Sequence, residues 1–62
     1  MTWKKYTFWK WYPDGVGSRM TGMFRNDTEA IAWYERLATN PVMEYALVRD
    51  GSKRAIRIQE RK

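Results

Sequence analysis

The chain of 62 residues contains neither cysteine nor histidine, which removes most of the common catalytic and metal-binding side chains. Without cysteine there is no disulfide, no thiol nucleophile and no thiolate metal ligand. Without histidine the chain lacks the side chain that most often acts as a general base near neutral pH. The remaining carboxylates are scattered along the sequence. We therefore expect no enzymatic activity, no cofactor and no metal site.

The chain also lacks long apolar runs. A membrane-spanning helix needs roughly 18 or more consecutive apolar residues, and no segment approaches that length. The first twelve residues contain no apolar core of a signal peptide. The absence of cysteine fits a reducing compartment. We expect a soluble cytoplasmic protein with no membrane partner, built as one domain over residues 1–62, near the lower size limit for a chain that folds alone.

Aromatic residues, in contrast, are concentrated near the N-terminus. Six of the ten aromatic residues lie between positions 3 and 12, and they alternate with lysines; they are Trp3, Tyr6, Phe8, Trp9, Trp11 and Tyr12. Aromatic residues favour strands, in which successive side chains point to opposite faces. A strand that is aromatic on both faces must be buried on both, or must use one face for a partner. A binding surface is therefore the leading hypothesis.

Charge is unevenly distributed around a net value of +5. Residues 1–25 sum to +4, residues 26–48 to −3 and residues 49–62 to +4, which together give +5. If the two ends form a sheet and the middle forms a helix, the molecule has a positive and a negative side. Such asymmetry favours association with acidic partners.

The first half of the chain predicts a β-hairpin, with strands at residues 2–12 and 19–25. The sequence Pro-Asp-Gly-Val-Gly-Ser between them has the composition of a turn. If residue 10 faces residue 20, Gly22 lies opposite Phe8 and leaves room for that ring. One face then collects Tyr6, Phe8, Tyr12, Met20, Gly22 and Phe24. The other collects Lys5, Thr7, Trp9, Trp11, Arg19, Thr21, Met23 and Arg25.

The middle of the chain predicts a helix over residues 27–39. Asn26 and Glu29 form the pattern of a capping box, and apolar residues recur at three- and four-residue spacing after it. Asn40-Pro41 ends the pattern, because the residue before a proline avoids helical geometry. Trp33 lies at the margin of the apolar stripe and, with Arg36, offers a smaller second patch; half-buried packing is the alternative for Trp33.

The last part predicts a second hairpin, with strands at residues 42–49 and 52–59. Asp50-Gly51 has the sequence of a two-residue turn. That turn places Tyr45 opposite Ile56 and Met43 opposite Ile58, so that Ile56 and Ile58 join the core. It also places Glu44 opposite Arg57 on the other face, as a cross-strand ion pair.

These elements predict an α+β fold of the type ββαββ: a four-stranded antiparallel sheet of order 2-1-3-4 with one helix on one face. One helix covers only one face of such a sheet, so the other face is open. We expect the candidate ligand-binding residues on that open face, and they are Trp9, Trp11, Lys5, Arg19, Met23, Arg25, Lys53 and Arg57.

Two classes of partner fit this set of residues. Nucleic acid, preferably single-stranded, fits because exposed rings stack on unpaired bases while lysine and arginine neutralise phosphates. A protein partner with an acidic surface fits because tryptophan, methionine and arginine are enriched at interface hot spots. In that alternative the chain acts as an inhibitor or adaptor, for example a viral protein acting on a host protein. The chain is expected to be a monomer, or a homodimer formed by stacking open faces or by pairing edge strands.

Overall fold

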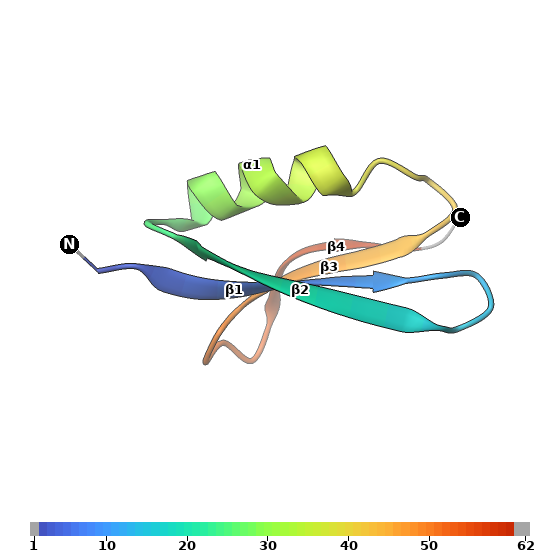
Figure 1. Ribbon diagram of the computed structural model, residues 1–62, viewed down its shortest axis with the longest axis horizontal. Helices are drawn as coiled ribbons and strands as arrows, with labels where there is room; N and C mark the ends of the chain where they lie inside the picture. Colours follow the sequence, from blue (N-terminus) through green and yellow to red (C-terminus); the bar gives the residue numbers. More distant parts are fainter. Residues whose placement is uncertain (1, 61–62) are drawn as a thin grey trace.

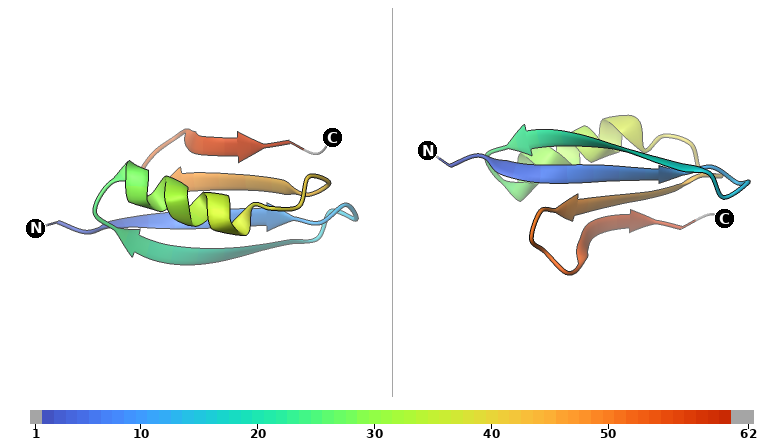
Figure 2. Two further views of the ribbon diagram at one scale, coloured as in Figure 1. Left: turned by 90° about the horizontal axis from the view of Figure 1, so that it is seen from above. Right: turned by 60° about the horizontal axis from the view of Figure 1, so that its bottom comes forward.

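The computed structural model describes residues 2–60 and has a four-stranded antiparallel sheet with one helix lying across one side (Figures 1 and 2). The elements are β1 (Lys4–Trp11), β2 (Gly17–Phe24), α1 (Asp27–Leu37), β3 (Glu44–Arg49) and β4 (Ala55–Gln59). The strand order is β2-β1-β3-β4. The predicted ββαββ fold, its strand order and its single helix are thus confirmed, although β4 begins three residues later than expected.

The core lies between α1 and the side chains that the central strands direct toward it. Tyr6, Phe8 and Leu47 are at most 2% exposed, and they pack with Ala30 and Tyr34 of the helix. Phe8 is the centre of the aromatic packing, because its ring meets the edges or faces of Trp33, Tyr34 and Tyr45 at centroid distances of 5.9, 5.8 and 5.5 Å. Edge-to-face arrangements of this kind are favourable beyond the area they bury.

The first hairpin is tighter than predicted by two residues. Phe8 pairs with Met20 and Tyr6 pairs with Gly22, so the predicted pairing of Gly22 with Phe8 is wrong. The reason lies in the turn, where Gly15 adopts φ +93° and its N–H donates to the Tyr12 carbonyl over 2.9 Å. A glycine in this conformation closes a three-residue loop. Because the shift is an even number of residues, the side chains within β1 and β2 keep their predicted faces, whereas Tyr12 and Arg25 lie outside the two strands.

Gly22 nevertheless makes room for a ring, as the sequence suggested, but for other rings. A Cβ atom at this position would lie 2.8 Å from Cε2 of Phe24 and 3.5 Å from the Trp33 ring. The ring of Phe24 therefore lies over the glycine two residues earlier in the strand, on the same face. Trp33 closes over the same place from the helix, which bears out half-buried packing for this residue.

The second hairpin differs from the prediction in a way that changes faces. Residues 50–54 form a longer connection in which the Ser52 N–H donates to Arg49 O and the Ser52 hydroxyl donates to Arg54 O. A register shift between Leu47 and Val48 follows, and Leu47 pairs with Arg57 while Ala46 pairs with Ile58. The shift is odd, so β4 residues exchange faces. Ile58 is 65% exposed rather than core.

The same shift removes the predicted ion pair of Glu44 and Arg57. Glu44 pairs with Trp11 of β1, whereas Arg57 lies opposite Leu47 on the helix side. The predicted core role of Ile56 is retained in part, because this side chain packs at the margin of the core. The difference in the turn after Arg49 therefore changes which face each residue of β4 occupies.

The helix begins where the sequence predicts. The side chain of Asn26 accepts a hydrogen bond from the Glu29 N–H over 3.0 Å, and Glu29 accepts one from the Arg25 N–H. The return bond thus goes to the residue before the cap. The helix ends at Leu37, two residues before the predicted end, with Ala38 as its C-cap.

Candidate binding face

The side chains that the strands direct away from α1 form a surface that we call the open face. The right-hand view of Figure 2 shows the sheet from the side away from the helix, with the strands in front of α1. Its members are Lys5, Thr7, Trp9, Trp11, Arg19, Thr21, Met23, Glu44, Ala46, Val48, Ala55 and Ile58. One row crosses all four strands, because Arg19 pairs with Trp9, Trp9 with Ala46 and Ala46 with Ile58. Ala46 is only 8% exposed because the larger side chains of Trp9 and Ile58 flank it.

Trp9 and Trp11 stack on each other on this face. Their ring centroids are 5.8 Å apart and the ring planes differ by 5°. Residues two apart in a strand share a face, which is why the two rings meet. A Cβ atom at Gly17, the partner of Trp11, would lie 2.7 Å from Cδ1 of Trp11, so the ring leans across the glycine backbone. Both tryptophans are partly exposed.

Cations lie over aromatic rings along the first hairpin. The Arg19 guanidinium carbon lies 5.5 Å from the centre of the Trp9 ring, directly across the strand pair. Arg25 lies 5.2 Å from the ring of Trp3. Each contact holds a guanidinium against an aromatic surface while its N–H groups remain able to donate.

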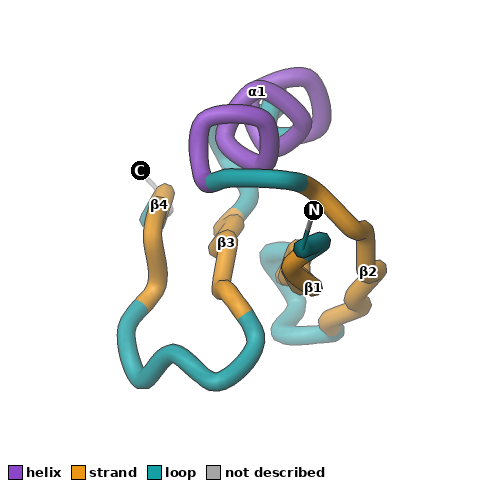
Figure 3. Tube along the Cα trace, turned by 90° about the vertical axis from the view of Figure 1, so that its left-hand side faces the viewer, coloured by secondary structure: helices purple, strands orange, loops and turns teal. Residues whose placement is uncertain are grey.

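The structure brings most of the predicted site residues to this side of the sheet. Lys5 and Met23 pair with each other on the open face, in line with Trp9, Trp11 and Arg19. Arg25 is farther away, six residues from Arg19 along the chain, a separation of roughly 20 Å in an extended strand. Lys53 is exposed in the connection of residues 50–54, which bends away from the helix (Figure 3).

The placement of Arg57 on the open face is wrong. It pairs with Leu47 on the helix side, and its charge acts on Tyr34 of α1. Burial raises the pKa of the Tyr34 hydroxyl, and the positive charge of Arg57 partly offsets that rise. Arg57 therefore belongs to the opposite side of the molecule from Trp9.

Ile58 is the open-face residue that sequence reasoning missed. The sequence predicts it in the core, because Asp50-Gly51 has the pattern of a complete two-residue turn. Gly51 does adopt φ +84°, but the chain continues through Ser52 before pairing resumes. The signal that could have corrected this is the serine after the glycine, since a serine hydroxyl readily bonds the backbone two residues on.

A group of three polar residues joins the helix to the sheet, and the sequence did not reveal it. The Tyr6 hydroxyl donates to Oδ1 of Asp27 over 2.5 Å, and Nη1 of Arg49 donates to both oxygens of the same carboxylate over 3.2 Å. Burial and the bond to the carboxylate raise the pKa of Tyr6 to about 12. The bond from Tyr6 and the charge of Arg49 lower the pKa of Asp27. This arrangement holds the first turn of α1 on β1 and β3, which is a structural role.

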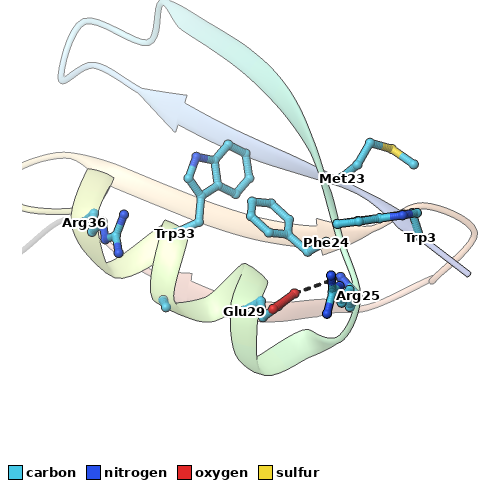
Figure 4. Close-up of a pocket in the computed structure, with 8 residues that line it drawn as sticks. Trp3, Met23, Phe24, Arg25, Glu29, Trp33 and Arg36 are labelled. Atoms are coloured by element: carbon cyan, nitrogen blue, oxygen red, sulfur yellow. Dashed lines mark hydrogen bonds between the residues drawn. The ribbon is translucent and has the colours of Figure 1, made fainter. Parts of the chain in front are cut away.

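A groove lies between the edge strand β2 and α1 (Figure 4). Its volume is about 610 Å³, and its lining is Trp3, Met23, Phe24, Arg25, Glu29, Ala32, Trp33 and Arg36. The rings of Phe24 and Trp33 are 5.0 Å apart and form its apolar wall. The predicted patch of Trp33 and Arg36 thus forms part of a larger concave site.

Comparisons of the chain with protein-family models, curated proteins and solved structures found no match. Within residues 2–60, no group of three or more acidic side chains is placed to hold a metal ion. No helix in that part of the chain is long and apolar enough to cross a membrane. The function therefore has to be argued from the two surfaces themselves.

Proposed function

We propose that the protein is a non-enzymatic binding module whose open face binds single-stranded nucleic acid. The observation that carries this proposal is the stacked pair Trp9 and Trp11, with Arg19 held over Trp9, on a face that the helix does not cover. Stacking of a base on an aromatic side chain contributes about 1–3 kcal/mol and needs no particular sequence. The adjacent guanidinium supplies a positive charge for a phosphate.

The distribution of charge supports the same side of the molecule. Lys5 and Arg19 lie on the open face, and Lys53 lies in the connection that bends toward that side. Glu44 is the carboxylate that the described strands place on this face, opposite Trp11. The cations on this side outnumber it, so the open face attracts a polyanion.

Tryptophan fluorescence provides the test, because two of the four tryptophans lie at the proposed site. We expect short single-stranded oligonucleotides to quench the emission saturably, and added salt to weaken binding steeply. A duplex of the same length should bind less tightly, since its bases are not available to the rings. Absence of any response at low salt would refute nucleic-acid binding.

Two arginines on opposite sides of the sheet give matched variants for this test. Arg19→Gln should weaken oligonucleotide binding and lower the slope of log affinity against log salt by about 1. Arg57→Gln removes the same charge from the helix side and should leave the slope almost unchanged. Equal effects of the two substitutions would mean that net charge, and not the open face, drives binding.

A protein partner with an acidic surface is the second candidate, and exposed apolar side chains on the open face favour it. Ile58 is 65% exposed in the row that contains Trp9 and Arg19, and Met23 is 53% exposed opposite Lys5 on the edge strand β2. Such a set resembles an interface hot spot more than a nucleic-acid channel. Binding of this kind is less sensitive to salt and should be lost in Ile58→Lys, which would leave oligonucleotide binding intact. A second copy stacked on the same face would appear as a dimer in sedimentation.

A further inference from the structure

The outer edge of β2 presents unpaired backbone groups. The Tyr12 N–H donates to Val16 O over 2.8 Å, which makes Tyr12 and Val16 a hydrogen-bonded pair. In an antiparallel ladder such pairs alternate with non-bonded ones. The even-numbered residues of β2 therefore bond to β1, and the N–H and C=O groups of Arg19, Thr21 and Met23 point outward. The Asp50 N–H donating to Lys5 O fits the same alternation on the other side of β1.

The two edges of the sheet differ in how well they are protected. β4 has five residues and follows a register shift, and its Gln59 side chain donates to Asn40 O and Met43 O. β2 has eight residues, and its pairing with β1 runs without a bulge. It contains neither proline nor lysine, which are common protective residues at sheet edges. A long regular edge of this kind can accept another strand.

The groove described above runs beside this edge and supplies the side-chain contacts that an added strand needs. Phe24 and Trp33 form its apolar wall, and Arg25 and Arg36 bring two positive charges to it. Within residues 2–60, neither arginine forms an ion pair with a carboxylate. Glu29 also lines the groove, and its carboxylate accepts the Arg25 backbone N–H. With two arginines against one carboxylate, the net charge of the groove is positive.

We propose that β2 and this groove bind an extended acidic segment of a partner protein, which adds as a fifth strand. Main-chain hydrogen bonds to Arg19, Thr21 and Met23 supply affinity, and the arginines and rings of the groove select acidic and apolar side chains. This surface shares Arg19, Thr21 and Met23 with the open face, but it uses their outward backbone groups and the groove between β2 and α1, so it does not depend on nucleic-acid binding.

A second copy of the chain fits the edge less well. β2 carries Arg19, is followed by Arg25 and contains no carboxylate. Antiparallel pairing of two β2 strands brings these arginines of both copies onto one short ribbon, and each copy carries a net charge of +5. Like charges across a strand pair are destabilising. An acidic partner strand replaces that repulsion with attraction.

Amide hydrogen exchange in the full chain, monitored by NMR, tests the proposal. The probe is a seven-residue peptide in which glutamate alternates with valine and phenylalanine. We expect exchange of the Arg19, Thr21 and Met23 amides to slow by about tenfold or more on binding, because bonded amides exchange only after local opening. The Met20 and Gly22 amides, already bonded to β1, should change little. A peptide with lysine in place of each glutamate should give no protection.

Two variants make the test specific. Thr21→Pro removes one outward N–H without removing a bond to β1, so it should abolish peptide protection while the sheet stays folded. Thr21→Val keeps the N–H and should bind normally. Arg36→Gln, a substitution on the exposed side of the helix, should weaken peptide binding several-fold even if the proline variant fails to fold.

Three results would overturn the proposal. They are absence of protection at saturating peptide, equal protection by the lysine peptide, and concentration-dependent protection of the same amides without peptide. The last would assign the edge to a second copy. Oligonucleotide binding should be the same in Arg36→Gln as in the original chain, because Arg36 lies on the helix and not on the open face. Failure at the edge is therefore separable from failure at the open face.

Discussion

Both faces of β1 carry aromatic side chains, but those on one face are buried and those on the other are partly exposed. Toward the helix, Tyr6 and Phe8 are 0% and 2% exposed and meet rings from α1 and β3. Away from the helix, Trp9 and Trp11 are partly exposed and meet mainly each other and the side chains of the first hairpin. An aromatic residue in a strand is thus not core by its type alone. The difference is whether another layer covers it.

The largest effect expected from this difference is on stability. Phe8→Ala should destabilise the fold by about 3–5 kcal/mol, as expected when a large core ring is removed. A chain of this length has only about 3–9 kcal/mol in total, so the variant should be largely unfolded. Trp9→Ala should cost only about 1–2 kcal/mol, from lost stacking and partial burial. Urea unfolding followed by circular dichroism measures both, and similar losses would mean that the open face is as well packed as the core.

The dependence of stability on pH tests the contacts of Asp27 that hold the helix on the sheet, namely those with Tyr6 and Arg49. The pKa of Asp27 is lowered from 3.8, so its contribution to stability is present above about pH 4 and is lost as the pH falls through the lowered value. The pKa of Tyr6 is raised from 10.0 to about 12, so its contribution is present below pH 10 and is lost as the pH rises through 12. We expect stability to fall at both extremes.

Tyr6→Phe is the control for that profile. It should cost about 1.5–3 kcal/mol near neutral pH, the usual net value of a hydrogen bond to a charged group, and should flatten the decline above pH 10. Phe8→Tyr is not a suitable comparison, because it adds a buried hydroxyl. An unchanged alkaline limb in Tyr6→Phe would show that the tyrosine hydroxyl is not what links the helix to β1.

Two glycines sharpen the comparison, because one lies under a ring on each face. In Gly22→Ala the new methyl group would collide with the Phe24 ring, which cannot move away because it packs on Trp33. The substitution should therefore destabilise the fold by about 1–2 kcal/mol through overpacking. In Gly17→Ala the new methyl group would collide with the Trp11 ring, but this ring can move toward solvent. The loss of stability should therefore be smaller. This substitution should instead weaken the exciton band that the stacked indoles of Trp9 and Trp11 give in circular dichroism. Equal stability losses with the exciton band unchanged would contradict the difference between the faces.

Local patterns in the sequence were enough to predict the helix, the strands and most residues of the open face. The cap at Asn26, the period of the helix and the alternation of β1 each act within a few residues, and the structure retains them. The sequence could not supply the register of β4, which depends on hydrogen bonds of Ser52 that compete with the simple turn. Nor could it supply Tyr6–Asp27, a contact across 21 residues. Arg57 and Ile58 were misplaced together because an odd shift moves a whole strand.

The smallest expected effect is also the most direct test of that register. If Ile58 lay in the core, as the two-residue turn predicts, Ile58→Ser would remove a buried side chain and cost roughly 2–5 kcal/mol. With the side chain 65% exposed on the open face, the cost should lie within about 0.5 kcal/mol. Leu47→Ser, at a position that is 0% exposed in the neighbouring strand, is the matched control and should unfold the chain. A large loss in Ile58→Ser would return β4 to the predicted register, move Arg57 to the open face and make that face more basic and less apolar than the structure has it.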